Sequence, residues 1–121
     1  MIRTIVAGTA LLGLLAAGTA QAAADTYSWT GMGENVPGSA KCSTYKMTID
    51  VTVDGTAVKG IFQQQGRDQR HFEAVLDGKG AFKGKAAVGG GSMNVSGSIS
   101  DKESAVLLDG YCKFGGKLTK K

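Results

Sequence analysis

The side chains in this chain that could carry catalysis are one histidine, ten carboxylates and two cysteines. A nucleophile and base pair would have to use His71, the single histidine. On the alternation of its segment His71 lies opposite Phe72, which places it in solvent, and its neighbours Arg70 and Glu73 are typical of a strand surface. We therefore expect no catalytic residues and a protein that binds rather than an enzyme.

The carboxylates and the glycine-rich segment indicate backbone roles. Four aspartates stand where turns favour this residue: Asp54, Asp77, Asp101 and Asp109. The glycines of 89–92 are followed by neither a helix nor a Lys-Ser/Thr pair, so this segment predicts a connection and not a phosphate-binding loop. One histidine and two cysteines do not make a zinc site, and we expect no metal and no cofactor.

Cys42 and Cys112 are the only cysteines, and we expect them to form a disulfide. A redox pair would more typically stand two residues apart. In the chain-entropy model, closing a loop of about 70 residues stabilises the fold by roughly 4 kcal/mol, as an upper figure. The predicted role of the two cysteines is therefore structural.

The first 22 residues are typical of a secretory signal peptide. Arg3 supplies the positive start, 5–17 is mostly apolar, and 20–22 fits the small-x-small cleavage rule, with a cut after Ala22 or after Ala24. The apolar run is shorter than the ~20 residues that a membrane-spanning helix needs. We expect a periplasmic or secreted product with no transmembrane segment in its mature form.

The remainder, 23–121, has the length of a single domain. The formal net charge of the whole chain is only +4, and its lysines and arginines are scattered. A nucleic-acid partner is therefore not expected.

Within this domain, apolar and polar residues alternate with a period of two, the pattern of a strand with one buried face. No segment of comparable length has a helical period. Turn signals such as Asp54-Gly55 and Asp109-Gly110 separate the alternating segments. About eight strands are predicted, over 26–31, 42–53, 56–64, 72–76, 82–88, 93–100, 105–108 and 111–119.

Strands joined by short turns pair antiparallel, and closing such a meander into an up-and-down barrel removes its two edges. The predicted fold class is therefore all-β, a small barrel in which a Cys42–Cys112 bridge lies where the first and last strands meet. A two-sheet β-sandwich is the alternative. An outer-membrane barrel is disfavoured because the outward parity carries charges such as Lys46, Asp50 and Lys83.

The inward parity mixes small residues with large ones. The gap at Gly60 predicts a bulge or a sharp bend. A barrel of eight strands is just wide enough to fill itself with side chains or to hold one small ligand, and both outcomes remain open. The large residues predicted to line the core or face a ligand are Trp29, Tyr45, Met47, Phe62, Phe72, Phe82 and Met93.

Several short segments resemble the small lipocalin-like and avidin-like (calycin-type) β-barrels among exported bacterial proteins. These segments are 27–31 with Trp29, 58–60, 97–100 and 112–116. The resemblance implies either a small ligand bound in the barrel or loops that inhibit secreted hydrolases. It carries over no binding residues.

Two hypotheses of function follow. The first is a binding protein that recognises a small molecule, a saccharide or a protein through the open end of the barrel. The alternative is a protein inhibitor of a secreted or foreign hydrolase, which would use the loops at 31–41 and 63–70. The expected partner is thus an unknown small ligand or an exported protein.

Overall fold

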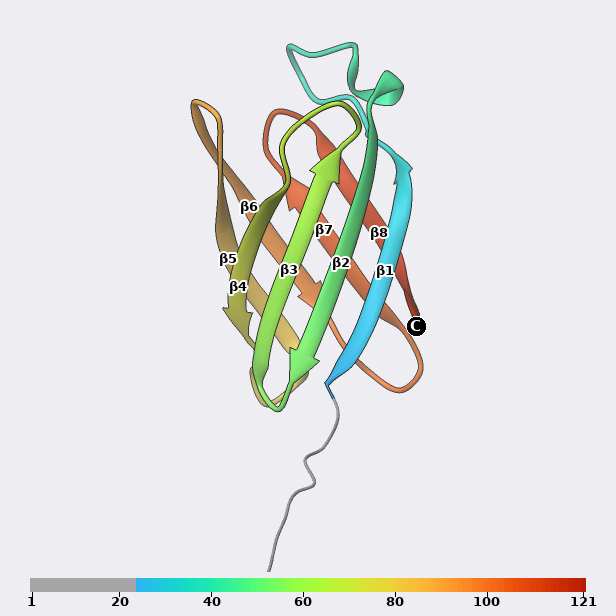
Figure 1. Ribbon diagram of the computed structural model, residues 1–121, viewed down its shortest axis with the longest axis vertical. Helices are drawn as coiled ribbons and strands as arrows, with labels where there is room; N and C mark the ends of the chain where they lie inside the picture. Colours follow the sequence, from blue (N-terminus) through green and yellow to red (C-terminus); the bar gives the residue numbers. More distant parts are fainter. Residues whose placement is uncertain (1–23) are drawn as a thin grey trace, which may run out of the picture.

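Eight antiparallel strands follow one another as a meander and form a nearly closed barrel in the computed structural model (Figure 1). The structure describes residues 24–121, and the predicted signal peptide, 1–22, lies outside the described residues. The predicted all-β barrel is confirmed. The elements are β1 (Asp25–Met32), the short 3-10 helix η2 (Cys42–Thr44), β2 (Lys46–Asp54), β3 (Ala57–Gln64), β4 (Arg70–Val75), β5 (Ala81–Val88), β6 (Gly91–Ser98), β7 (Ser104–Asp109) and β8 (Lys113–Lys120).

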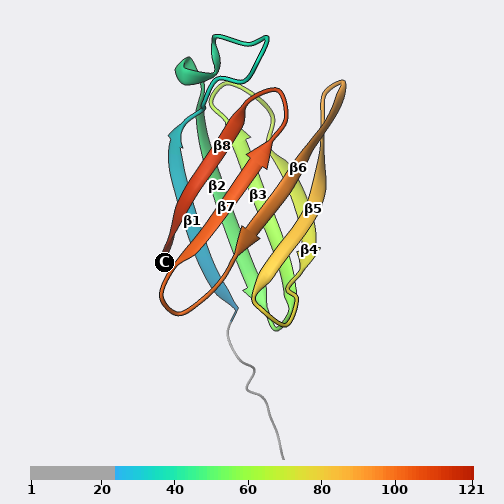
Figure 2. The same ribbon diagram turned by 180° about the vertical axis from the view of Figure 1, so that it is seen from behind.

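The strands form one sheet in the order β4-β3-β2-β1-β8-β7-β6-β5. The first and last strands pair at Tyr27–Lys120 and Ser28–Thr119. Because this pairing joins the two halves of the meander, the chain forms a barrel and not two separate sheets. Figures 1 and 2 show β1–β4 on one side of the barrel and β5–β8 on the other. Within residues 24–121, no helix is long and apolar enough to cross a membrane.

The barrel is not closed by hydrogen bonds between β4 and β5, which are the two edge strands of the sheet. These strands are consecutive and lie side by side, yet no backbone ladder joins them in the described part of the chain. Side chains close this seam instead, since the rings of Phe72 and Phe82 stack across it with centroids 6.3 Å apart. The expectation that every tight turn joins a hydrogen-bonded pair is therefore wrong here.

The predicted strand 42–53 begins later than its alternation suggested. Its first residues form η2, and the strand starts at Lys46. Cys42 therefore lies outside the β2 ladder, and the inward–outward alternation of β2 does not determine the direction of its side chain. The disulfide joins η2 to the connection between β7 and β8, with 5.5 Å between the two Cα atoms.

Glycines make room for aromatic rings inside the barrel. A Cβ on Gly60 would overlap the ring of Phe72, and one on Gly97 would overlap the ring of Phe82. Gly60 pairs regularly with Val51 on one side and Phe72 on the other. The predicted bulge at Gly60 is therefore wrong, because the missing side chain accommodates a ring and the backbone stays regular.

A continuous apolar core fills the middle of the barrel. Phe62, Phe72 and Phe82 form a row from β3 to β5, in which neighbouring ring centroids lie 6.4 and 6.3 Å apart. The buried apolar side chains of the core are Tyr27, Cys42, Met47, Ile49, Val51, Val58, Phe62, Phe72, Phe82, Ala86, Met93, Val95, Val106, Leu108, Cys112, Phe114 and Leu118.

The predicted position of His71 and of two of the turn aspartates is confirmed. Asp77 and Asp101 lie in connections, whereas Asp54 and Asp109 are the last residues of β2 and β7.

In the β4–β5 connection, Asp77 Oδ1 accepts hydrogen bonds from the backbone N–H groups of Lys79, at 2.7 Å, and Ala81, at 3.0 Å. These hydrogen bonds, the one from Ala81 first, lower the pKa of the Asp77 carboxyl. Asp77 therefore stabilises its turn, and His71 is exposed on the outside of β4.

Candidate functional site

The two ends of the barrel carry different connections. At the upper end in Figure 1, the chain between β1 and β2, which contains η2, lies beside the connections β3–β4, β5–β6 and β7–β8. We call this the loop end. The opposite end, with the connections β2–β3, β4–β5 and β6–β7, is the turn end.

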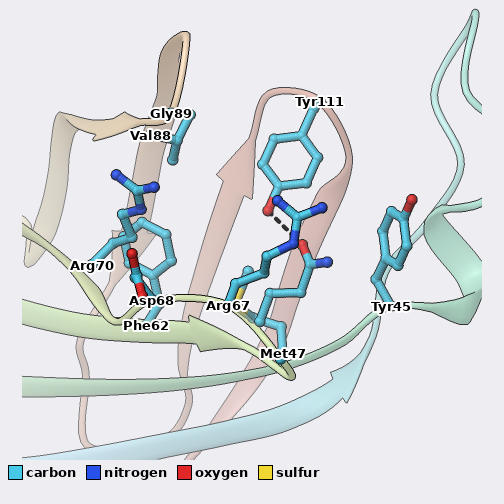
Figure 3. Close-up of a pocket in the computed structure, with 11 residues that line it drawn as sticks. Tyr45, Met47, Phe62, Arg67, Asp68, Arg70, Val88, Gly89 and Tyr111 are labelled. Carbon is cyan, nitrogen blue, oxygen red and sulfur yellow. Dashed lines mark hydrogen bonds between the residues drawn. The ribbon is translucent and has the colours of Figure 1, made fainter.

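A cavity of about 420 Å³ opens at the loop end. This volume lies in the range of about 300–1,000 Å³ that is typical of small-molecule sites. The buried side chains of Met47 and Phe62 form its floor, Val88 stands at its side beside Arg70, and polar side chains surround its mouth (Figure 3). The lining residues are Tyr45, Met47, Phe62, Gln64, Gly66, Arg67, Asp68, Arg70, Val88, Gly89 and Tyr111.

Tyr111 and Gln64 form a hydrogen-bonded pair across the cavity wall. The Tyr111 hydroxyl donates to Gln64 Oε1 at 2.7 Å, and the dashed line in Figure 3 marks this bond. The ring of Tyr111 also packs edge-on against Phe114, with centroids 5.8 Å apart. Partial burial raises the pKa of the Tyr111 hydroxyl, while the positive charges of Arg67 and Arg70 act to lower it.

Arg67 lies in the tight connection between β3 and β4, and Arg70 is the first residue of β4. The backbone N–H of Arg67 donates to the Gln64 carbonyl at 2.9 Å, and Gln63 Nε2 donates to the Arg67 carbonyl at 2.8 Å. Gly66 has a φ of 84°, which this turn requires and a side chain would disfavour. The turn and the start of β4 thereby set the two guanidinium groups at the cavity mouth.

The disulfide lies next to the backbone of the two cavity tyrosines, Tyr45 and Tyr111. Tyr111 precedes Cys112, and its carbonyl oxygen lies 3.4 Å from Sγ of Cys42. Tyr45 follows η2, and its N–H donates to the Cys42 carbonyl at 3.1 Å. Both cysteines are fully buried. The bridge links the two backbone segments that carry Tyr45 and Tyr111 and so limits their movement relative to each other.

The structure brings some of the predicted core or ligand-facing residues to the cavity and leaves others away from it. Tyr45, Met47 and Phe62 line the cavity. Phe72, Phe82 and Met93 are core residues that do not line it.

Trp29 also lies away from the cavity. It is partly buried and packs against the core, where its indole occupies the space beside Gly31 and Gly116. The tryptophan therefore contributes to the junction of β1 and β8.

Reasoning from the sequence missed the polar part of the site. The sequence predicts Gln64 as the end of the strand 56–64. It predicts the polar segment 63–70, with Arg67, Asp68 and Arg70, as an exposed loop of the inhibitor hypothesis, and it assigns none of these residues to a cavity. Tyr111 had been placed only at the start of the last strand. The signals that could have found them are two arginines within one short hairpin connection and a tyrosine next to a disulfide cysteine.

The side chains around the cavity combine polar and apolar groups. The polar groups are guanidinium, amide, phenol and one carboxylate, set around an apolar floor. In residues 24–121, no group of three or more His, Cys, Asp or Glu side chains gathers in a way that could hold a metal ion.

No family model, curated protein or solved structure matches the chain. What the cavity takes must therefore be inferred from its own residues.

Proposed function

We propose that this chain is a binding protein that holds a small ligand in the cavity at the loop end of the barrel. The observation that carries the proposal is the cavity itself, with Met47 and Phe62 beneath it, Val88 at its side and polar groups around its mouth. A ligand would bury an apolar body on this floor and place polar groups among the side chains above it. Export to the periplasm or the cell exterior belongs to the same proposal, since the Cys42–Cys112 disulfide persists in oxidising compartments.

A matched pair of fluorescent compounds tests the proposal. N-phenyl-1-naphthylamine is an apolar aromatic probe, and 1-anilinonaphthalene-8-sulfonate is the same aromatic body with a sulfonate added. We expect at least one of them to bind with a stoichiometry of one per chain. Binding by neither compound would overturn the proposal.

A blocking variant assigns the binding to the cavity. Val88→Phe places a larger side chain at the side of the cavity, and we expect it to weaken probe affinity about tenfold or more, as lost shape complementarity implies. Val75→Phe is the matched control, because Val75 is 67% exposed and lies outside the cavity lining. Equal affinity in both variants would place the bound probe elsewhere.

A second candidate function is inhibition of a secreted hydrolase by the loop between β1 and β2. This loop is held at its base, since Gly33 N–H donates to the Tyr45 carbonyl at 2.9 Å. Glu34 also exchanges two backbone hydrogen bonds with Lys113, at 2.7 and 3.2 Å. A pre-ordered loop loses little entropy on docking, which is how rigid inhibitors gain affinity.

The test of this second candidate is stoichiometric inhibition of serine, cysteine and metal-dependent hydrolases. Replacement of residues 35–40 by glycine and serine should abolish any inhibition and leave probe binding in the cavity intact. Failure to inhibit any hydrolase at equimolar concentration would exclude this use of the loop.

A further inference from the structure

We infer that the cavity selects a small organic anion, a carboxylate, sulfonate or phosphate group on an apolar body, and that Arg67 and Arg70 hold the charged group. This inference rests on the proposed function and specifies its ligand class. The proposed function requires only that a small ligand enters, whereas this inference requires that the ligand be negatively charged.

The position of the two guanidinium groups is the first argument. Arg67 stands on the short β3–β4 connection, which its own hydrogen bonds hold in place. Arg70 is the first residue of β4 and is held in the ladder opposite Phe62 of β3, so both side chains extend from an ordered backbone. The Arg70 side chain extends toward the β5–β6 connection (Figure 3). One of its terminal nitrogens lies 3.4 Å from the point where a Cβ would stand if Gly89 carried a side chain. The two cations thus stand at the mouth of the cavity, above its apolar floor.

The charge at this mouth is only partly compensated within the protein, since two arginines face one carboxylate there. In the described part of the chain, the ion pairs are Lys120–Asp25 and Lys121–Asp50, and neither involves Arg67 or Arg70. The lining contains one carboxylate, Asp68, which forms no ion pair with either arginine. Guanidinium groups match the geometry of carboxylate and phosphate oxygens, and the hydrogen bonds they donate to anions are about twice as strong as neutral ones.

The neutral groups of the site also supply donors. Only 8% of the Gln64 surface is exposed, and its Oε1 accepts a hydrogen bond from the Tyr111 hydroxyl. The remaining polar atom of the Gln64 side chain is the donor Nε2. With two guanidinium groups added, the mouth offers mainly donors, and an acceptor-rich anion is their complement.

The floor defines the other half of the ligand. Met47 and Phe62 are almost fully buried and close the cavity from beneath, while Tyr45 and Val88, which are partly buried, keep apolar surface accessible to a ligand. Such a surface favours an aromatic or aliphatic body. The site therefore fits an amphipathic anion better than a bare inorganic ion or a neutral sugar.

The test compares the two probes on the unmodified chain and on two double variants. Arg67→Gln with Arg70→Gln removes the two cations of the cavity. Lys83→Gln with Lys85→Gln is the matched control, since it removes the same charge from two exposed residues of β5 outside the cavity lining. The dissociation constant of each probe is measured by fluorescence titration.

We expect the sulfonate probe to bind the unmodified chain about tenfold or more tightly than the neutral probe. The arginine double variant should weaken the sulfonate probe by about tenfold or more and leave the neutral probe unchanged, because charge-assisted hydrogen bonds are lost. The lysine double variant should change neither dissociation constant. Raising the ionic strength from about 0.01 M to about 0.1 M, which shortens the Debye length from about 30 Å to about 10 Å, should weaken only the sulfonate probe.

Other outcomes overturn the inference. If the neutral probe binds as tightly as the sulfonate, or if both double variants weaken the sulfonate equally, the arginines do not select an anion. In these cases the proposed function stands, because a ligand still enters. If neither probe binds, the proposed function fails and the inference fails with it.

Discussion

The turn end and the loop end of this barrel are built from the same strands, yet they have different interiors. From the middle of the barrel toward the turn end, Phe72 and Phe82 stack across the β4–β5 seam, and glycines opposite them leave room for the rings. Toward the loop end, the inward residues become polar at Gln64 and Arg70, and a cavity opens above Phe62. One end is filled and the other is hollow.

The difference shows how one barrel can combine stability with binding. Packed rings and matched glycines provide the apolar burial that stabilises the domain. Toward the loop end Met47 and Phe114 are still buried, and around the cavity the Cys42–Cys112 bridge and the Tyr111–Gln64 hydrogen bond hold the wall. Substitutions at the two ends should therefore separate stability from ligand affinity.

The largest effect on stability is expected from Phe82→Ala at the filled end. Removing a buried aromatic ring typically costs about 3–5 kcal/mol, and Gly97 opposite cannot fill the space. Urea unfolding followed by circular dichroism measures the loss. The probe affinity of the folded fraction should not change, and a loss below about 1 kcal/mol would show that the ring is not tightly packed.

Removal of the disulfide should affect both stability and binding. Cys42→Ala with Cys112→Ala releases a bridge across a sequence separation of 70 residues, which stabilises the fold by up to about 4 kcal/mol. Because the bridge lies next to the backbone of Tyr45 and Tyr111, we also expect weaker probe binding in the fraction that remains folded. Unchanged unfolding after reduction would contradict the structural role of the bridge.

Gly60→Ala tests the fit of glycine and ring at the filled end. The added methyl group overlaps the ring of Phe72, and overpacking of this kind typically costs about 1–3 kcal/mol. Gly91→Ala is the matched control, since Gly91 is also a strand residue and a Cβ there meets nothing within 4 Å. Equal stability of the two variants would refute the close packing of this end.

The smallest expected effect is that of Tyr111→Phe at the hollow end. Loss of the hydrogen bond to Gln64 should cost about 0.5–1.5 kcal/mol. The raised pKa of Tyr111 also predicts a pH dependence. The folded state keeps the phenolic proton while the unfolded state loses it, so stability should fall as pH rises from about 10 through the folded pKa.

Urea unfolding as a function of pH measures this dependence. The slope above pH 10.0, the ordinary pKa of tyrosine, should be smaller in Tyr111→Phe than in the unmodified chain. Tyr27→Phe is the control on another tyrosine of the same barrel. Identical slopes in the unmodified chain and in Tyr111→Phe would contradict the assignment.

The filled end could be predicted from sequence better than the hollow end. Alternation with a period of two determines which residues point inward, and Met47, Phe62 and Phe82 are indeed buried. The period holds only within strands, so it failed at Cys42, where the chain forms η2 before β2 begins. It also could not distinguish a bulge at Gly60 from a regular strand that accommodates a ring.

The polar mouth of the cavity could not be predicted for a different reason. Arg67 lies in a turn and Arg70 at the first residue of the next strand, within a polar segment whose composition alone indicates solvent exposure. Their proximity to Tyr111 depends on the curvature of the barrel, which brings the β3–β4 and β7–β8 connections to one cavity. The spacing of these residues along the sequence does not indicate how far the arginines lie from Tyr111 in the fold.

The most direct test of the hollow end is an NMR titration of the isotope-labelled chain with 1-anilinonaphthalene-8-sulfonate. We predict that shifts of backbone amide signals concentrate at the cavity, on Tyr45, Gln64, Arg70 and Tyr111. Signals of the turn end, such as those of Val58 and Ser104, should not move. Shifts that instead follow the outer groove beside His71 and Lys85, or that spread over both ends, would contradict a ligand site at the loop end.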